Sequence, residues 1–129
     1  MSVNKRTVAR YMEAYGRWDH AAILGCLTEG VVWECPGYYS IQGKAAFDAQ
    51  IEGPGSAGPP TIAVTRLTEE NDVVIAEGSV EAKMTDGTVL RLVFCDVFEM
   101  ERGLIRRLVS YLMQQGAGSV DQGVLGGES

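Results

Sequence analysis

The sequence has few of the residues that build metal centres and disulfide frameworks. Its 129 residues include one histidine, His20, and three cysteines, Cys26, Cys35 and Cys95. The cysteines are odd in number and widely spaced, a pattern that fits neither a disulfide framework nor a zinc site. We therefore expect no metal ion. Reduced thiols are typical of a cytoplasmic protein, which is the location we expect.

Basic residues and long apolar runs are also scarce. Eleven Lys and Arg residues stand against 17 Asp and Glu residues, which gives a net charge of −6. Nucleic acids and anionic membranes attract surfaces that are rich in Lys and Arg, so we expect neither as a partner. No segment approaches the roughly 20 apolar residues that span a bilayer, and the N-terminal stretch lacks the apolar core of a signal peptide.

Helical patterns occupy most of the first part of the chain. Three short helices are expected, over residues 3–16, 20–27 and 44–51. In the first helix, Val8, Met12 and Tyr15 recur at intervals of three and four residues, which places them on one helical face. Asp19 stands at the N-cap position of the second helix, and Gly30 is expected to close that helix.

Strand patterns dominate the rest of the chain. Strands are expected over residues 31–35, 38–42, 61–69, 72–85, 88–101 and 104–114. Turn sequences such as Asp86-Gly87 separate the last four, which predicts an antiparallel meander. The Gly- and Pro-rich segment 53–60 is a predicted loop that lacks the Lys-Ser/Thr ending of a phosphate-binding loop, so we expect no nucleotide or other cofactor. The sequence does not say whether this loop forms a lid.

This order of elements predicts one α+β domain over residues 1–114 and a flexible Gly-rich tail over residues 115–129. Three N-terminal helices would pack on one face of a strongly curved antiparallel sheet. The bent and covered sheet would form a cone-shaped α+β barrel with an internal pocket. A chain of this length buries roughly two-thirds of the surface that its unfolded form exposes, so a core with a pocket is feasible.

One carboxyl group interrupts an otherwise apolar strand face. In the segment LRLVFCDVFEM, every second residue is apolar except Asp96. A buried charge is costly unless it is paired or neutralised, and desolvation raises the pKa of a carboxyl group. A neutral Asp96 would donate a hydrogen bond to a ligand oxygen. The alternative is an aspartate that bonds the backbone or a neighbouring side chain at a pocket wall.

Several short motifs are shared with a known superfamily. They are RY in the first helix, WD before the second, VVWECPG, GKAAF, and DVFEMERGLIRRLVSYL near the end. With the order of elements, they make the chain resemble the nuclear transport factor 2-like superfamily, in particular its SnoaL-like and ketosteroid isomerase-like branch. The resemblance covers about residues 5–113. Because this fold hosts both enzymes and pure binding modules, the resemblance does not select one function.

The resemblance assigns roles to a few positions. Tyr11 falls where the isomerases place a hydrogen-bonding tyrosine, and Asp96 falls where they place a protonated aspartic acid. Tyr11 and Asp96 are therefore the candidate catalytic residues. The general-base aspartate of the isomerases aligns with Cys35, so that base is missing. The carboxylate used by the cyclase branch aligns with Ser110, and the dehydratase branch needs more histidines than His20 alone.

Six further residues are candidates for the wall of a ligand pocket. They are Trp33, Cys35, Phe94, Ser110, Trp18 and Tyr15. Core packing is the competing interpretation for the aromatic residues, and it applies equally to Tyr11, which shares a helical face with Tyr15. The competing interpretation of Cys35 is a small apolar wall residue, whose thiol pKa would rise above the usual value of about 8.5.

Three functions are compatible with these features, and the sequence does not decide whether the protein is an enzyme. The first is an isomerase- or cyclase-like enzyme that acts on an apolar carbonyl compound, steroid- or polyketide-like, with Asp96 and Tyr11 polarising the carbonyl oxygen. The second is a non-catalytic pocket that binds a small apolar ligand. The third is a dimerisation module without a ligand. The resemblance also implies a homodimer that forms through the outer face of the sheet.

Overall fold

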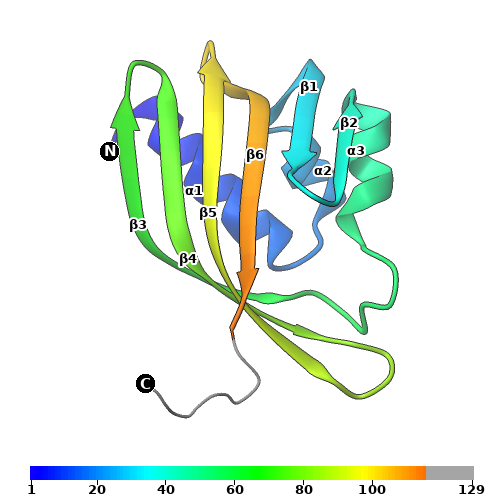
Figure 1. Ribbon diagram of the computed structural model, residues 1–129. Helices are drawn as coiled ribbons and strands as arrows, with labels where there is room; N and C mark the ends of the chain where they lie inside the picture. The colour runs from blue at the N-terminus through cyan, green and yellow to red at the C-terminus, as the bar shows by residue number, and fades with distance from the viewer. Residues whose placement is uncertain (116–129) are drawn as a thin grey trace.

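The computed structural model describes residues 1–115, and the predicted tail over residues 115–129 lies almost wholly outside this range. Three helices and six strands follow one another along the chain (Figure 1). The helices are α1 (Val3–Tyr15), α2 (His20–Leu24) and α3 (Lys44–Ile51). The strands are β1 (Leu27–Cys35), β2 (Tyr39–Gln42), β3 (Thr61–Glu70), β4 (Val73–Lys83), β5 (Val89–Glu101) and β6 (Leu104–Gln114).

Helices α1 and α2 begin at side-chain caps. The Ser2 hydroxyl accepts a hydrogen bond from the Lys5 N–H, and the Asp19 carboxylate accepts one from the Ala22 N–H. The expected cap at Asp19 is confirmed, but the predicted end of α2 at Gly30 is wrong. The earlier Gly25 ends the helix, and Gly30 lies within β1, where the pairing with β6 changes register. A glycine inside a strand often marks such an irregularity, and this one resembled a helix end in sequence.

The six strands form one sheet in the order β2-β1-β6-β5-β4-β3. Strands β3 to β6 make the predicted antiparallel meander, but β1 lies parallel to β6, so the sheet is mixed and the prediction of a wholly antiparallel sheet is wrong. The sequence pattern of β1 does not reveal its direction, which depends on how the helices return the chain. In the described residues the sheet is open, with β2 and β3 at its edges, and it does not close into a barrel.

The helices cover one face of the sheet (Figure 1). Helix α1 contacts β3, β4 and β6, and α3 contacts β1 and β2. The largest fully buried side chains between the layers include Phe47, Phe98, Ile23, Leu27, Ile51 and Ile105. The rings of Trp33 and Phe47 stack with centroids 4.3 Å apart, which joins β1 to α3. None of the helices within residues 1–115 is both long and apolar enough to cross a membrane.

The loop over residues 53–60 is attached to the turn between β4 and β5. The Ala57 N–H donates a 2.8 Å hydrogen bond to the Lys83 carbonyl, and the Thr85 N–H donates a 2.9 Å bond to the Gly55 carbonyl. These two backbone bonds hold the loop beside the long hairpin. The loop is therefore part of the wall near the end of α1, and it is not a free flap in this structure.

Candidate functional site

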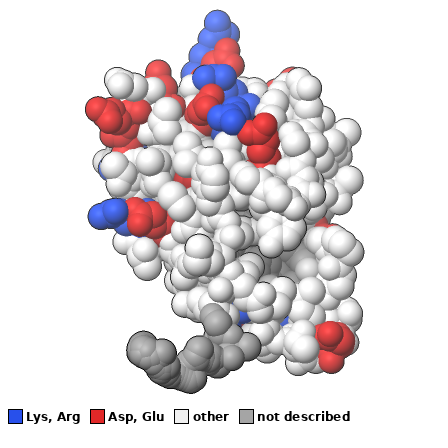
Figure 2. Space-filling model, in the orientation of Figure 1, with Lys and Arg blue, Asp and Glu red and all other residues white. Residues whose placement is uncertain are grey.

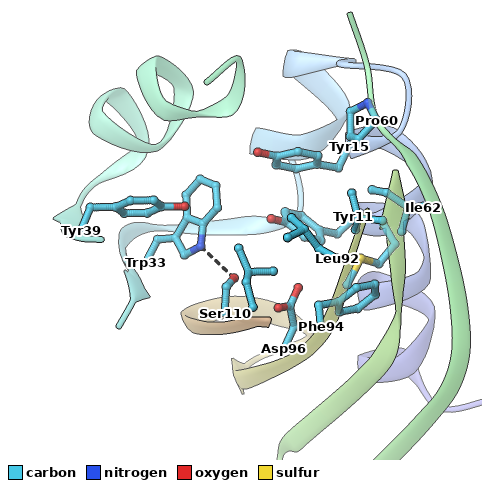
Figure 3. A pocket seen from close by; sticks show the side chains of 13 residues that line it. Tyr11, Tyr15, Trp33, Tyr39, Pro60, Ile62, Leu92, Phe94, Asp96 and Ser110 are labelled. Carbon is cyan, nitrogen blue, oxygen red and sulfur yellow. Dashed lines mark hydrogen bonds between the residues drawn. The ribbon is translucent and has the colours of Figure 1, made fainter. Parts of the chain in front are cut away.

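A cavity of about 170 Å³ lies between the helices and the inner face of the sheet (Figure 3). Its wall is mostly apolar and aromatic. The lining residues are Tyr11, Met12, Tyr15, Trp33, Tyr39, Pro60, Ile62, Val80, Leu92, Phe94, Asp96, Ser110 and Leu112. They come from α1, β1, β2, β4, β5, β6, the start of β3 and the end of the loop over residues 53–60. The cavity therefore exists only in the folded chain.

Among the described residues that line the cavity, Asp96 alone has a carboxyl group, and it is buried. The residue is 9% exposed, and its Oδ1 atom has no hydrogen-bond partner within the part of the chain that the structure describes. Burial raises the pKa of Asp96 to about 7, although the neighbouring Ser110 hydroxyl opposes this rise by hydrogen bonding to the charged form. Near neutral pH a large share of the carboxyl groups are therefore protonated and able to donate a hydrogen bond.

Ser110 is held next to Asp96 by the pairing of two strands. The two residues are cross-strand partners on β5 and β6. The indole Nε1–H of Trp33 donates a 3.1 Å hydrogen bond to Ser110 Oγ, which leaves the Ser110 hydrogen free to point at the carboxyl group (Figure 3). Sequence reasoning proposed Trp33 and Ser110 separately as wall residues and missed this link, because β1 and β6 are far apart along the chain.

The two tyrosines of α1 differ in how their hydroxyl groups are used. The Tyr15 hydroxyl donates a 3.0 Å hydrogen bond to the Ile51 carbonyl at the end of α3. Tyr11 is more deeply buried, and its ring lies edge-on to Phe98 with centroids 5.5 Å apart. Burial raises the pKa of both phenols, with further contributions that include the nearby Asp96, so both are neutral donors at physiological pH. Tyr15 therefore has a structural bond to the end of α3, and Tyr11 lines the cavity beside Phe98.

Two predicted wall residues are not part of this cavity. Cys35 is buried at the end of β1 with a free thiol, whose pKa is raised chiefly by burial. Trp18 lies in the turn between α1 and α2, with a positive φ of 51°, and packs against the core. The cavity wall includes neither residue.

Several wall residues were not proposed from the sequence. Leu92 lies two residues before Phe94 on the same strand face as Asp96, and that alternation was a usable signal. Val80 lies on the small, apolar face of β4. Tyr39 and Pro60 come from a short edge strand and a loop, where no periodic pattern identifies a side that faces the cavity.

A glycine on β4 sets the position of the Phe94 ring. Gly78 pairs with Phe94 on β5, and a Cβ atom at Gly78 would come within 2.8 Å of that ring and 2.1 Å of the Ala63 carbonyl oxygen on β3. The absent side chain lets the ring lie close to the β4 backbone. Phe94 therefore forms part of the floor of the cavity without filling it.

His20 lies at the start of α2, outside the cavity wall. Its ring nitrogens contact Asp48 Oδ1 at 2.5 Å and Glu52 Oε2 at 2.6 Å, both on or next to α3. These hydrogen bonds, first to Asp48 and then to Glu52, raise the pKa of His20. Protonated His20 thus joins the start of α2 to α3. Within residues 1–115, no group of three or more His, Cys, Asp and Glu side chains is arranged to hold a metal ion.

Comparisons with solved structures agree with this fold. The first is the structure of an M. tuberculosis LEH-like epoxide hydrolase, 20% identical, with 86% of this chain and 83% of that chain covered and a TM-score of 0.76. The second is TerC co-crystallised with polyporic acid, which is 22% identical, with 84% of this chain and 90% of that chain covered and a TM-score of 0.75. The third is a putative ketosteroid isomerase from Kribbella flavida DSM 17836, which is 20% identical, with 94% of this chain and 84% of that chain covered and a TM-score of 0.72.

At these identities the likeness establishes the fold alone. No curated protein matches the chain. The family model for the SnoaL-like domain matches residues 8–108, which include β1 to β5 and every cavity residue except Ser110 and Leu112. The chain therefore belongs to the SnoaL-like domain family, within the nuclear transport factor 2-like superfamily.

Proposed function

We propose that this protein binds a small, apolar carbonyl or enol compound in the cavity, with Asp96 and Tyr11 donating hydrogen bonds to the ligand oxygen. The observation that carries the proposal is the unpartnered Oδ1 atom of Asp96, buried in a wall that is otherwise almost wholly apolar. A buried polar atom without a partner is expensive to maintain, on the order of 1–3 kcal/mol. A ligand oxygen at that position would supply the missing hydrogen bond.

The same two donors would serve an enzyme. Neutral donors that meet an oxygen on which negative charge develops stabilise an enolate. An isomerase- or cyclase-like reaction on a carbonyl compound is therefore the catalytic form of the proposal. Two proteins that share the fold are TerC, which was co-crystallised with polyporic acid, and the putative ketosteroid isomerase from Kribbella flavida. Both are in keeping with an oxygen-bearing cyclic ligand.

One observation favours the non-catalytic form as the second candidate. Within residues 1–115, Asp96 is the single carboxylic acid of the cavity wall, and no histidine lies in that wall. Loss of a general base costs on the order of 10²–10⁴-fold in rate, so a single carboxyl group would have to polarise the carbonyl and also move the proton. A binding protein needs only the cavity and its polar anchors.

Phenol, which resembles an enol, tests the binding proposal. The fluorescence of Trp33 in a Trp18→Phe background should report binding, because Trp33 lines the cavity and Trp18 does not. If neutral Asp96 is the donor, affinity should fall about tenfold between pH 6 and pH 8, as the carboxyl group ionises around its pKa of about 7. The Asp96→Asn variant retains a donor and should lose this pH dependence, whereas Asp96→Leu should bind on the order of tenfold more weakly at pH 6. Equal affinity of all three proteins would contradict the proposal.

Tyr11 and Tyr15 provide a matched pair for the second donor. Tyr11→Phe should weaken phenol binding several-fold at pH 6, since the proposal assigns its hydroxyl to the ligand. Tyr15→Phe should mainly lower thermal stability, because the Tyr15 hydroxyl bonds the Ile51 carbonyl.

The catalytic form is separated from the binding form by deuterium exchange next to the carbonyl of a cyclic ketone. Exchange at the uncatalysed rate, even at high protein concentration, would leave the binding form.

We also propose a homodimer that forms through the outer face of the sheet, and a cytoplasmic location. Figure 2 views the protein from the sheet side, where charged side chains lie mainly along the margins and the middle is largely uncharged. In that middle, Val93 pairs with Met113 and Cys95 with Tyr111, and Met113 is 70% exposed. Exposed apolar patches of this kind often mark interfaces. Sedimentation should give a dimer, and Tyr111→Asp should shift it to a monomer; a wild-type monomer at high concentration would contradict this.

A further inference from the structure

The enclosed part of the cavity is small for the multi-ring ligands that the fold could accept, and its outer end is open to solvent. Its volume is about 170 Å³. Sites for drug-sized ligands usually measure about 300–1,000 Å³. A cavity of about 150 Å³ lined by Leu, Ile and Phe holds one benzene molecule, and a water molecule occupies about 30 Å³ of liquid. By this comparison, one six-membered ring with a single oxygen substituent fills the space.

The distribution of polar and apolar residues also orients such a ligand. Asp96, Ser110 and Tyr11 are buried. The hydroxyl groups of Tyr15 and Tyr39 are also in the wall, on partly buried residues, and the Tyr15 hydroxyl already bonds the Ile51 carbonyl. Leu92 and Ile62 are only partly buried, and Leu112 is 40% exposed. A ligand that bonds Asp96 would therefore place its oxygen deeper than these three hydrocarbon side chains.

Tight packing around the deep end prevents simple enlargement. Phe94 lies against Gly78, so its ring cannot move toward β4 without displacing backbone. Trp33 is stacked on Phe47 and bonded to Ser110. The Trp33 ring is thus held on two sides, and the Phe94 ring is blocked toward β4. Well-packed interiors yield little to an oversized ligand. Leu92 is less buried than either ring, so its side chain is the element of the wall whose removal should most readily admit a second ring.

We infer that the ligand is a single-ring compound, of the size of a phenol, a cyclic enol or a cyclohexenone, bound with its oxygen at Asp96, and that a steroid or fused polyketide is excluded from the closed part of the cavity. This inference rests on the proposed function and narrows its ligand class. A single-ring ligand would satisfy Oδ1 and leave no empty space. Any additional fused ring would have to lie outside, beyond Leu92 and Leu112.

Calorimetry with phenol, 2-naphthol and the phenolic steroid estradiol tests this limit at pH 6, on the complete chain. Phenol should bind. 2-Naphthol and estradiol should each bind at least tenfold more weakly, although both are more hydrophobic than phenol. In the Leu92→Ala variant, the affinity for 2-naphthol should rise at least tenfold relative to the affinity for phenol. Leu90→Ala is the matched control, because Leu90 lies two residues along the same strand face but not in the cavity wall. It should leave the order unchanged.

The outcomes separate the two ideas. Tighter binding of 2-naphthol or estradiol than of phenol by the unaltered chain, lost in Asp96→Leu, would overturn the single-ring limit and keep the proposed function. Absence of binding by all three probes at millimolar concentration would overturn both. The order of affinities on the unaltered chain decides the matter even if Leu92→Ala is unstable. Binding of phenol alone, with a gain for 2-naphthol in Leu92→Ala, supports the limit.

Discussion

The two faces of β5 treat carboxyl groups in opposite ways. On the inner face, Asp96 pairs across the sheet with Ser110, and its Oδ1 atom has no partner among the described residues. On the outer face, Glu99 pairs with Arg107, which bonds Glu99 Oε2 at 2.5 Å and Glu34 Oε1 at 2.6 Å. Arg106 adds a second contact to Glu99 at 2.9 Å. Asp96, which contacts no cation among the described residues, and Glu99, which contacts two arginines, are thus only three positions apart on one strand.

Of these two carboxyl groups, Glu99 is accounted for by its ion pairs, whereas the burial of Asp96 is not accounted for by such contacts. An ion pair at a surface is close to neutral in stability, so Glu99 can be understood as a contribution to strand pairing and solubility. A carboxyl group that is buried without a cation lowers stability whenever it ionises. Near neutral pH, where Asp96 begins to ionise, its burial lowers the stability of the fold. This feature of the inner face is the one on which the proposed ligand rests.

The largest expected effect is a change of stability with pH at Asp96. Its pKa is raised from 3.8 to about 7 by burial, so the folded state holds a proton that the unfolded state releases. Stability from this group is complete below pH 4 and is lost as pH rises through 7. Relative to Asp96→Asn, the wild-type free energy of unfolding should fall by up to about 3–4 kcal/mol between pH 4 and pH 8.

Urea unfolding at several pH values measures this difference. Glu99→Gln serves as the outer-face control and should keep the wild-type fall, because Asp96 is still present in it. If the free energy of unfolding changed with pH in the same way in wild type and Asp96→Asn, the Asp96 carboxyl group would not titrate differently on folding. The distinction between the inner and outer faces would then be wrong.

A smaller loss of stability is expected for a substitution at Gly78. It tests how tightly the inner face of the sheet is packed around Phe94. Gly78→Ala places a Cβ atom 2.1 Å from the Ala63 carbonyl oxygen and 2.8 Å from Phe94, so the backbone or the ring must shift. Overpacking of this kind costs about 1–3 kcal/mol. Gly30→Ala is the control, since a Cβ atom there meets nothing within 4 Å. Denaturant melts should separate the two variants, and equal stability would show that Phe94 has room to move.

The smallest effect is expected on the outer face. Arg107→Met removes a cation that bridges Glu34 and Glu99, and its side chain is 38% exposed. Partly exposed pairs contribute about 1 kcal/mol or less, and salt screens them. Thermal melts should therefore show a modest loss at low salt that shrinks in 1 M salt. Arg91→Met, which removes one exposed pair with Glu81 at 3.2 Å, should lose less. A salt-independent loss as large as that of Gly78→Ala would contradict the distinction between the faces.

Local patterns predicted most of the secondary structure. The spacing of Val8, Met12 and Tyr15 corresponds to α1, and the Asp86-Gly87 turn separates β4 from β5 as expected. The alternation around Asp96 correctly predicted that this carboxyl group faces the core. These features depend on neighbours within a few residues. Two errors followed from local ambiguity: both Gly25 and Gly30 could end α2, and nothing in β1 indicates that its partner β6 runs parallel.

Six of the eight residues proposed from the sequence line one cavity, and their roles toward a ligand stay a prediction. The six are Asp96, Tyr11, Tyr15, Trp33, Phe94 and Ser110, whereas Cys35 and Trp18 do not line it. A strand face can be assigned from alternation, but the depth of a residue along that face relative to the helices cannot. Cys35 is two residues from Trp33 on the same strand, yet only Trp33 reaches the cavity.

The sequence by itself determined that an acid would lie on an apolar strand face, because alternation is a property of neighbouring residues. Only the tertiary structure decided what surrounds that acid. The distance from Trp33 to Ser110, the empty side of Oδ1 and the size of the cavity all depend on contacts between segments far apart in the chain. Such contacts arise from the packing of helices on the sheet, which no local pattern encodes.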